Sequence, residues 1–321
     1  MTNHVPHRPA QTVAKVFLAL TVLTWIQIAF GALVRSKQAG LSCPDWPMCN
    51  GAWIPNTHVP GVIFEFGHRA LAGVVTLVYV LGAFLGLRDP QIRQKYRGLL
   101  MGAGVLLVVQ ALMGAATVLL VNRSEGVPRP QTWTVVIHLI LGNTFAALSL
   151  LTALKLYAMS QPEPVPDLTP LRRSTPILAR IWDACLLLQM IVGGAIAGSL
   201  QGMACSHFPQ CYEGIWIPSG PDVNPWTHVQ LLHRLNACVL FIVGWTLAYQ
   251  LKLRGRLGLV ARALAWLVLA QALLGAMNIW RGLSSHVTTA HSLVGALLFS
   301  TTAVLATELA AYKRNLRNAG K

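Results

Sequence analysis

A glutamate, a histidine and an arginine lie within five residues of one another at the start of a long apolar segment. They are Glu65, His68 and Arg69, in the stretch FEFGHRALAG. Glu65 and His68 are three residues apart, so they would share one face of a helix. Ionisable groups inside a membrane-spanning helix are costly, and where they occur they usually mark a functional site. This stretch is therefore a candidate active site.

A second stretch repeats this pattern without the acid. QLLHRLNA contains His233 and Arg234, but Gln230 occupies the place of the glutamate. A carboxylate can accept a proton or stabilise a developing positive charge. We therefore predict that Glu65 is catalytic. The alternative is a helix-start acid favoured by the macrodipole, which contributes only about 0.3 to 1 kcal/mol.

Two further histidines, His138 and His291, lie near the start of later apolar segments. Each of the four lies within roughly two turns of the outer end of its predicted helix, at about 1.5 Å of rise per residue. Paired imidazoles at one depth suit axial ligation of haem iron inside a four-helix bundle. The alternative is that each histidine only hydrogen-bonds a neighbouring helix. The predicted iron ligands are His68, His138, His233 and His291.

Arg69 and Arg234 directly follow two of these histidines, at the outer interface where haem propionates could reach water. A guanidinium pairs well with a carboxylate, so both arginines are predicted to contact haem. The alternative is an arginine that extends to the lipid headgroups.

Four of the six cysteines form two pairs with the same spacing. Cys43 and Cys49 lie between apolar segments, as do Cys205 and Cys211, and five residues separate the members of each pair. On the oxidising side of a bacterial membrane each pair is expected to form a short disulfide. A metal site that uses His207 is the weaker alternative, because the first pair has no matching histidine.

Composition indicates an integral membrane protein. Of 321 residues, 54% are hydrophobic and 11% are charged, and the mean hydropathy is +0.54. The formal net charge is +15, but the basic residues are scattered between apolar segments, so no nucleic-acid partner is expected. Long continuous apolar segments predict helices that span a lipid bilayer, rather than a barrel. The predicted spans are 15–34, 62–87, 98–121, 133–157, 177–200, 227–251, 258–280 and 287–311.

The distribution of lysine and arginine predicts the orientation. Alternate loops and termini contain 18 of these residues on one side and 5 on the other. Cytoplasmic segments carry the excess, so both termini are predicted to be cytoplasmic and the cysteine loops periplasmic. A bacterial inner membrane is the simplest location, and the first apolar segment is interpreted as a retained helix.

The chain is interpreted as a duplication of four spans. Gln27 and Gly31 correspond to Gln189 and Gly193, and VVQALMGAA later corresponds to LAQALLGAM. An even number of spans gives both units one orientation, with an axis along the membrane normal. The predicted fold is an all-α membrane protein with two tandem four-helix bundles. The predicted parts are an N-terminal half (1–159), a cytoplasmic linker (160–176) and a C-terminal half (177–321).

With these motifs in this order, the sequence resembles the haem A synthase family. These bacterial and mitochondrial membrane enzymes oxidise the C8 methyl group of haem O to the formyl group of haem A. The resemblance covers residues 31–311. It rests on GALVRSKQAGLSCPDWPMC, the E-x-x-H-R motif, VIHLILGN, the second H-R pair and HSLVGALL.

The resemblance implies different roles for the two halves. His68 and His138 would hold the haem O substrate, and His233 and His291 would hold a b-type haem. Glu65 would be the catalytic carboxylate. Either one histidine leaves the iron so that dioxygen can bind, or the methyl group loses electrons and water attacks. Implied partners are haem O synthase and terminal oxidase assembly factors, and a homo-oligomer is compatible with the sequence.

Two other functions are alternatives. A dihaem electron carrier across about 30 Å of hydrocarbon would need haems near both faces, whereas the four histidines are predicted on one side. A haem transporter or chaperone would need the histidines but not Glu65.

Overall fold

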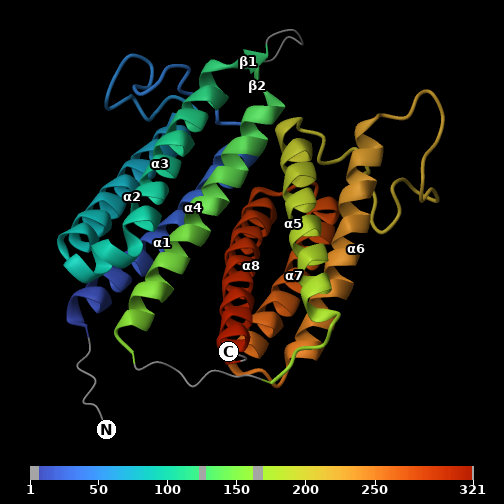
Figure 1. Cartoon of the computed structure of the whole chain (residues 1–321). Helices are drawn as coiled ribbons and strands as arrows, with labels where there is room; N and C mark the ends of the chain where they lie inside the picture. The colour runs from blue at the N-terminus through green and yellow to red at the C-terminus, as the bar shows by residue number, and fades with distance from the viewer. Residues whose placement is uncertain (1–6, 123–127, 162–168, 320–321) are drawn as a thin grey trace.

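The computed structural model describes residues 7–122, 128–161 and 169–319, and most of these residues lie in eight long helices (Figure 1). All eight are long and apolar enough to cross a membrane. The predicted all-α, eight-span membrane fold is therefore confirmed. The helices are α1 (Arg8–Ser36), α2 (Val62–Arg88), α3 (Pro90–Leu119), α4 (Thr132–Met159), α5 (Thr175–Gly198), α6 (Trp226–Leu251), α7 (Gly255–Trp280) and α8 (Ser285–Ala319).

Several helices extend beyond the predicted apolar spans. Helix α3 begins at Pro90, where the side chain of Asp89 accepts hydrogen bonds from the main-chain N–H groups of Gln91 (3.0 Å) and Ile92 (2.9 Å). An aspartate cap followed by proline at the first helical position favours a helix start. Only Asp89 separates α2 from α3. A short antiparallel pair, β1 (Val121–Asn122) and β2 (Arg129–Pro130), lies between α3 and α4 and was not predicted.

Each half is arranged as a ring of four helices. Helix α1 contacts α2 and α4, and α3 contacts the same two helices, so α2 and α4 stand diagonally across the ring. Helices α5 to α8 repeat this arrangement, with only a slight contact between α5 and α8. The halves meet where α1 and α4 contact α8 and where α4 contacts α5 (Figure 1).

The tightly packed core of each half lies toward the end where α1 begins and α8 ends. In the N-terminal half it includes Phe17 early in α1, Tyr79 late in α2 and Phe145 in α4. In the C-terminal half it includes Trp182 and Leu247. Tyr79 follows His68 by eleven positions, which corresponds to about 16 Å along a helix. The histidines therefore lie beyond the packed cores.

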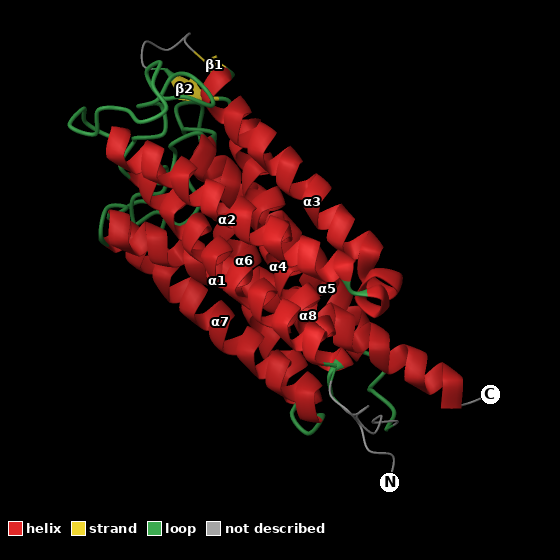
Figure 2. Cartoon of the chain, turned by 90° about the vertical axis from the view of Figure 1, so that its left-hand side faces the viewer, coloured by secondary structure: helices red, strands yellow, loops and turns green. Residues whose placement is uncertain are grey.

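The two long loops, 37–61 and 199–225, lie at the end opposite the chain termini (Figure 2). This follows from an even number of spans, which returns the chain to the side where it began. The even-numbered helices all start at the loop end, so residues near their N-terminal ends share a similar depth.

Candidate functional site

The structure places the four predicted histidines at matching positions on alternate helices. Each is the seventh or eighth residue of α2, α4, α6 or α8. His68 and His138 lie on the diagonal helices α2 and α4, and His233 and His291 lie on the diagonal helices α6 and α8. Each predicted pair thus belongs to one ring of helices.

A glutamine from the preceding helix contacts the first histidine of each half. Gln27 Nε2, on α1, donates to the carbonyl oxygen of His68 at 2.9 Å and lies 3.1 Å from its Nδ1. Gln189 Nε2, on α5, donates to the carbonyl oxygen of His233 at 3.1 Å and lies 3.3 Å from its Nε2. In each half, one glutamine amide therefore contacts both the main-chain carbonyl and the imidazole ring of the histidine.

The second histidine of each half has the same kind of neighbour. Gln110 Nε2, on α3, lies 3.4 Å from His138 Nε2, and Gln271 Nε2, on α7, lies 3.2 Å from His291 Nε2. Sequence reasoning had not predicted these four glutamines as histidine partners. The signal was available in their recurrence at matched positions of both halves.

Three of the histidines have one ring nitrogen without a hydrogen-bond partner. Within the described residues, Nδ1 of His138, His233 and His291 is buried and has no hydrogen-bond partner. Leaving such an atom unpaired costs about 1 to 3 kcal/mol. No group of three or more histidine, cysteine, aspartate or glutamate side chains in this part of the chain could hold a bare metal ion. Two histidines facing each other fit a metal that brings its own equatorial donors, as haem iron does.

Glu65 forms a buried ion pair with Arg69 on the next turn of α2. Glu65 Oε1 accepts from Arg69 Nε at 3.0 Å, and the two side chains are only 8% and 14% exposed. Arg69 Nη1 also donates to the carbonyls of Asp45 (2.7 Å) and Met48 (2.6 Å), and its Nη2 to that of Cys43 (2.8 Å). The guanidinium thus joins the start of α2 to loop 37–61. The predicted contact of Arg69 with haem stays a prediction.

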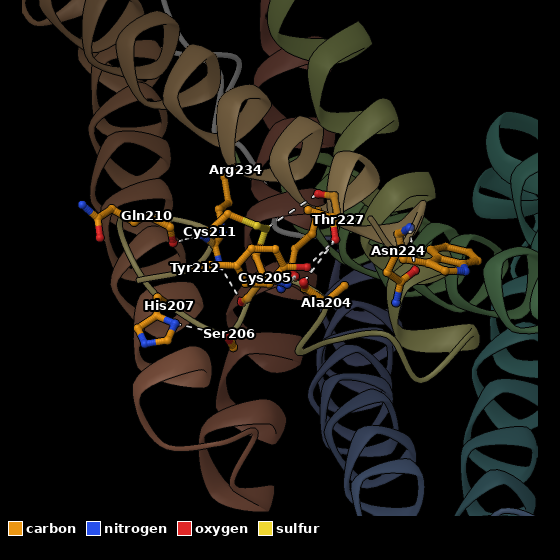
Figure 3. Close-up of a disulfide and its surroundings, with 12 residues drawn as sticks. Ala204, Cys205, Ser206, His207, Gln210, Cys211, Tyr212, Asn224, Thr227 and Arg234 are labelled. Atoms are coloured by element: carbon orange, nitrogen blue, oxygen red, sulfur yellow. Dashed lines mark hydrogen bonds between the residues drawn. A yellow bond between two sulfur atoms is a disulfide. The ribbon is translucent and has the colours of Figure 1, made fainter. Parts of the chain in front are cut away.

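Arg234 anchors the second loop in the same way. Its Nη1 donates to the carbonyl of Gln210 at 2.9 Å and its Nη2 to that of Cys205 at 3.0 Å (Figure 3). Gln230 binds this loop too, because its Oε1 accepts from the Cys205 main-chain N–H and its Nε2 donates to the Gly202 carbonyl at 2.6 Å. A haem contact of Arg234 likewise stays a prediction.

The loop cysteines are joined as two disulfides, Cys43 to Cys49 and Cys205 to Cys211, with S–S distances of 1.96 and 2.00 Å. His207, the alternative metal ligand, is exposed, and its Nδ1 lies 3.0 Å from the hydroxyl of Ser206 (Figure 3).

Comparison with known proteins gives matches over almost the whole chain. The COX15-CtaA family, described as cytochrome oxidase assembly protein, matches residues 14–60 and 59–303. The haem A synthase of Geobacillus thermodenitrificans is 26% identical over 289 residues, which are 87% of this chain and 86% of the relative. That of Lysinibacillus sphaericus is 28% identical over 293 residues, 88% and 90% of the two chains. That of Listeria monocytogenes serovar 1/2a is 26% identical over 299 residues, 89% and 92%. The family match extends from the first helix into the eighth. The haem A synthase motifs of the sequence agree with this match, and this chain belongs to the COX15-CtaA family.

Proposed function

We propose that this protein is a haem A synthase, which oxidises the C8 methyl group of haem O to the formyl group of haem A. The observation that carries the proposal is an asymmetry within a chain of this family. Two histidine pairs have the same glutamine contacts, but a carboxylate accompanies only one of them. Relatives named haem A synthase, at 26 to 28% identity over most of the chain, support the same reaction.

The N-terminal half would bind haem O through His68 and His138, and the C-terminal half would bind haem b through His233 and His291. The two pairs lie in separate rings of helices, and this separation supports two independent haems. When bound, haem b would supply one-electron redox chemistry. The chain itself orients both groups through histidines that glutamines hold from neighbouring helices.

Glu65 would act on the reacting substituent as the methyl group is oxidised. If water supplies the oxygen, conversion of the methyl group to a formyl group gives up both electrons, to an external acceptor, and protons, and a carboxylate can accept one of these protons. Glu65 lies in the first turn of α2, and its carboxylate accepts a hydrogen bond from the Arg69 side chain. Arg69, held by three loop carbonyls, would fix the carboxylate in position.

The protein would lie in a bacterial inner membrane with both termini in the cytoplasm and loops 37–61 and 199–225 in the periplasm. The 18 against 5 excess of lysine and arginine at the end with the termini supports this orientation. A reporter fused after Lys321 should be active only if it functions in the cytoplasm. A periplasmic reporter that is active at this position would contradict the orientation.

The substrate would come from a haem O synthase, and the product would pass to assembly factors of a terminal oxidase. The fold is compatible with a homo-oligomer.

The decisive experiment supplies haem O to membranes that contain the protein and identifies the extracted haems. Conversion to haem A supports the proposal, with membranes that lack the protein as the control. Haem O that is bound but chemically unchanged would indicate a transporter or chaperone. Haem b at both sites without conversion would indicate an electron carrier.

A further inference from the structure

The four glutamines that contact the histidines belong to one recurring turn. In each odd-numbered helix the glutamine is followed four residues later by a glycine, one helical turn away on the same face. The same contact between a helix turn and a histidine therefore occurs four times, twice in each half. The turns are Gln27 to Gly31, Gln110 to Gly114, Gln189 to Gly193 and Gln271 to Gly275.

The glycine of each turn makes room for the imidazole ring. A Cβ atom at Gly193 would lie 2.8 Å from His233 Cε1, and one at Gly31 would lie 2.9 Å from His68 Cε1. The corresponding distance is 3.1 Å for Gly114 and 3.5 Å for Gly275. A methyl group would thus displace the ring in the first two sites, because carbon atoms at contact prefer about 3.5 to 4.0 Å. The glutamine and the glycine together set where each imidazole lies.

One residue distinguishes the turn from Gln189 to Gly193 from its counterpart in the N-terminal half. Asn236, one turn beyond His233 on α6, is buried, and its Nδ2 donates to Gln189 Oε1 at 2.7 Å and to the Cys185 carbonyl at 2.8 Å. The Gln189 amide is thereby held at both ends, by Asn236 through its oxygen and by the His233 carbonyl through its nitrogen.

The corresponding residue of the N-terminal half is Leu71, three positions after His68 as Asn236 is three positions after His233. A leucine side chain cannot donate a hydrogen bond. Gln27 Oε1 is accordingly buried without a partner among the described residues. The Gln27 amide is held only through its nitrogen, so it is freer to turn.

We propose that Asn236 is a positioning residue that locks the Gln189 amide against His233, so that the C-terminal half retains its haem while the N-terminal half, with Leu71, lets its haem leave. This rests on the proposed function, in which one haem is resident and the other must enter as substrate and depart as product. A fixed imidazole favours retention because contacts that orient a ligating histidine strengthen its hold on the metal. An unlocked one favours exchange.

The test measures how fast haem leaves the purified full-length protein for an excess of apomyoglobin. Asn236→Leu should speed loss of the resident haem about 10- to 100-fold, since the Gln189 amide is no longer held at its oxygen and can turn away from His233. Asn236→Ala provides the same comparison if leucine impairs folding. The reverse change, Leu71→Asn, should slow loss of haem from the N-terminal half and raise the haem content of the purified protein.

A double-mutant cycle separates a positioning role from general packing. If Asn236 acts through Gln189, Asn236→Leu should cause little further loss of haem in a Gln189→Leu background. Additive effects in the double variant would overturn the proposal. So would a folded Asn236→Leu protein that releases haem at the wild-type rate.

The midpoint potential of the resident haem gives a readout that does not depend on turnover. Asn236→Leu should shift it, because the imidazole is no longer held in one orientation, and Leu71→Asn should leave it unchanged. An unchanged potential in Asn236→Leu would count against the lock. A wild-type protein that purifies with haem but converts no haem O would contradict the proposed function and leave the retention measurement intact.

Discussion

The two halves differ in the residues on either side of the matched histidines His68 and His233. Three residues before the histidine, the N-terminal half has Glu65 and the C-terminal half has Gln230; three residues after it, they have Leu71 and Asn236. In the C-terminal half both side chains are amides whose hydrogen bonds fix the loop and the Gln189 turn. In the N-terminal half one is a buried acid and the other is apolar. Around the first histidine, the duplicated scaffold therefore has more hydrogen bonds in the C-terminal half, and it has the buried acid in the N-terminal half.

The largest expected effect comes from the histidines, because they would hold the iron directly. His233→Ala or His291→Ala should remove the resident b-type haem, whereas His68→Ala or His138→Ala should leave it bound and abolish haem A formation. Pyridine haemochrome spectra of the purified variants report the haem type and its amount. If all four substitutions remove the same spectral signal, the two halves do not hold separate haems.

Glu65→Gln makes the N-terminal half resemble the C-terminal half at the proposed catalytic position. Loss of a group that accepts a proton in the transition state should lower the rate about 10² to 10⁴-fold, or roughly 3 to 5.5 kcal/mol at about 1.4 kcal/mol per tenfold. The protein should still bind haem, and haem O or a hydroxylated product should accumulate in cell extracts. Gln230→Glu is the reciprocal change: it loses the hydrogen bond to the Gly202 carbonyl and should destabilise loop 199–225, but it should change the rate of the folded protein less than about tenfold. Abundant haem A from Glu65→Gln would remove this residue from the mechanism.

Arg69 and Arg234 should differ because Arg69 pairs with a carboxylate, whereas Arg234 donates hydrogen bonds to main-chain carbonyls. Arg69→Gln leaves the Glu65 carboxylate buried and unpaired, which should cost about 3 to 5 kcal/mol of unfolding free energy. Arg234→Gln loses hydrogen bonds from a charged donor to carbonyls and should cost about 1.5 to 3 kcal/mol. Thermal unfolding in detergent compares them. Combining Arg69→Gln with Glu65→Gln should restore part of the loss, and equal losses for the two arginines would argue against the ion pair.

The disulfides should affect the two halves alike, since each closes a ring of the same size. Replacing either pair with serine should cost less than the typical 2 to 4 kcal/mol, because short rings restrict the unfolded chain less. Thiol labelling of denatured, unreduced protein should modify only Cys185 and Cys238. Labelling of a loop cysteine would show that its ring is open.

The smallest effect is a pH dependence confined to one loop. The Asp45 carboxylate accepts the main-chain N–H groups of Asn50 (2.6 Å) and Gly51 (2.8 Å), and the bond from Gly51 foremost lowers its pKa below the ordinary value. A carboxyl with a lowered pKa in the folded state stabilises the fold above its unfolded pKa, and this contribution disappears as pH falls through the folded value. In loop 199–225 the neutral amide of Gln210 accepts the Gly214 N–H at 3.0 Å and does not titrate.

Acidification below about pH 4 should therefore loosen loop 37–61 before loop 199–225. Hydrogen exchange measured across this range compares the two loops in one molecule. Asp45→Asn should remove the difference, and simultaneous loosening in the wild type would show that the carboxylate does not hold its loop.

The amino-acid sequence by itself determined the eight helices, their duplication and the depth of the histidines. Apolar length fixes the spans because a bilayer requires about 20 residues per helix, and counting from a helix start fixes depth because the rise per residue is constant. The spacing of Glu65, His68 and Arg69 also placed them on one or two adjoining turns before any contact was known. The start of α3 was predicted too late, because the Asp89 cap lies outside the apolar segment.

Only the tertiary structure decided which groups meet. The contact of Gln27 with His68 depends on how α1 and α2 rotate against each other, which the period of a single helix does not set. Arg69 binds three main-chain carbonyls, and no side-chain pattern can reveal such partners, because every residue has a carbonyl. The hydrogen bond from Asn236 to Gln189 joins α6 to α5 through residues that are 47 positions apart in the chain. Leu71 cannot make this hydrogen bond in the N-terminal half, and the difference becomes visible only when the structures of the two halves are compared.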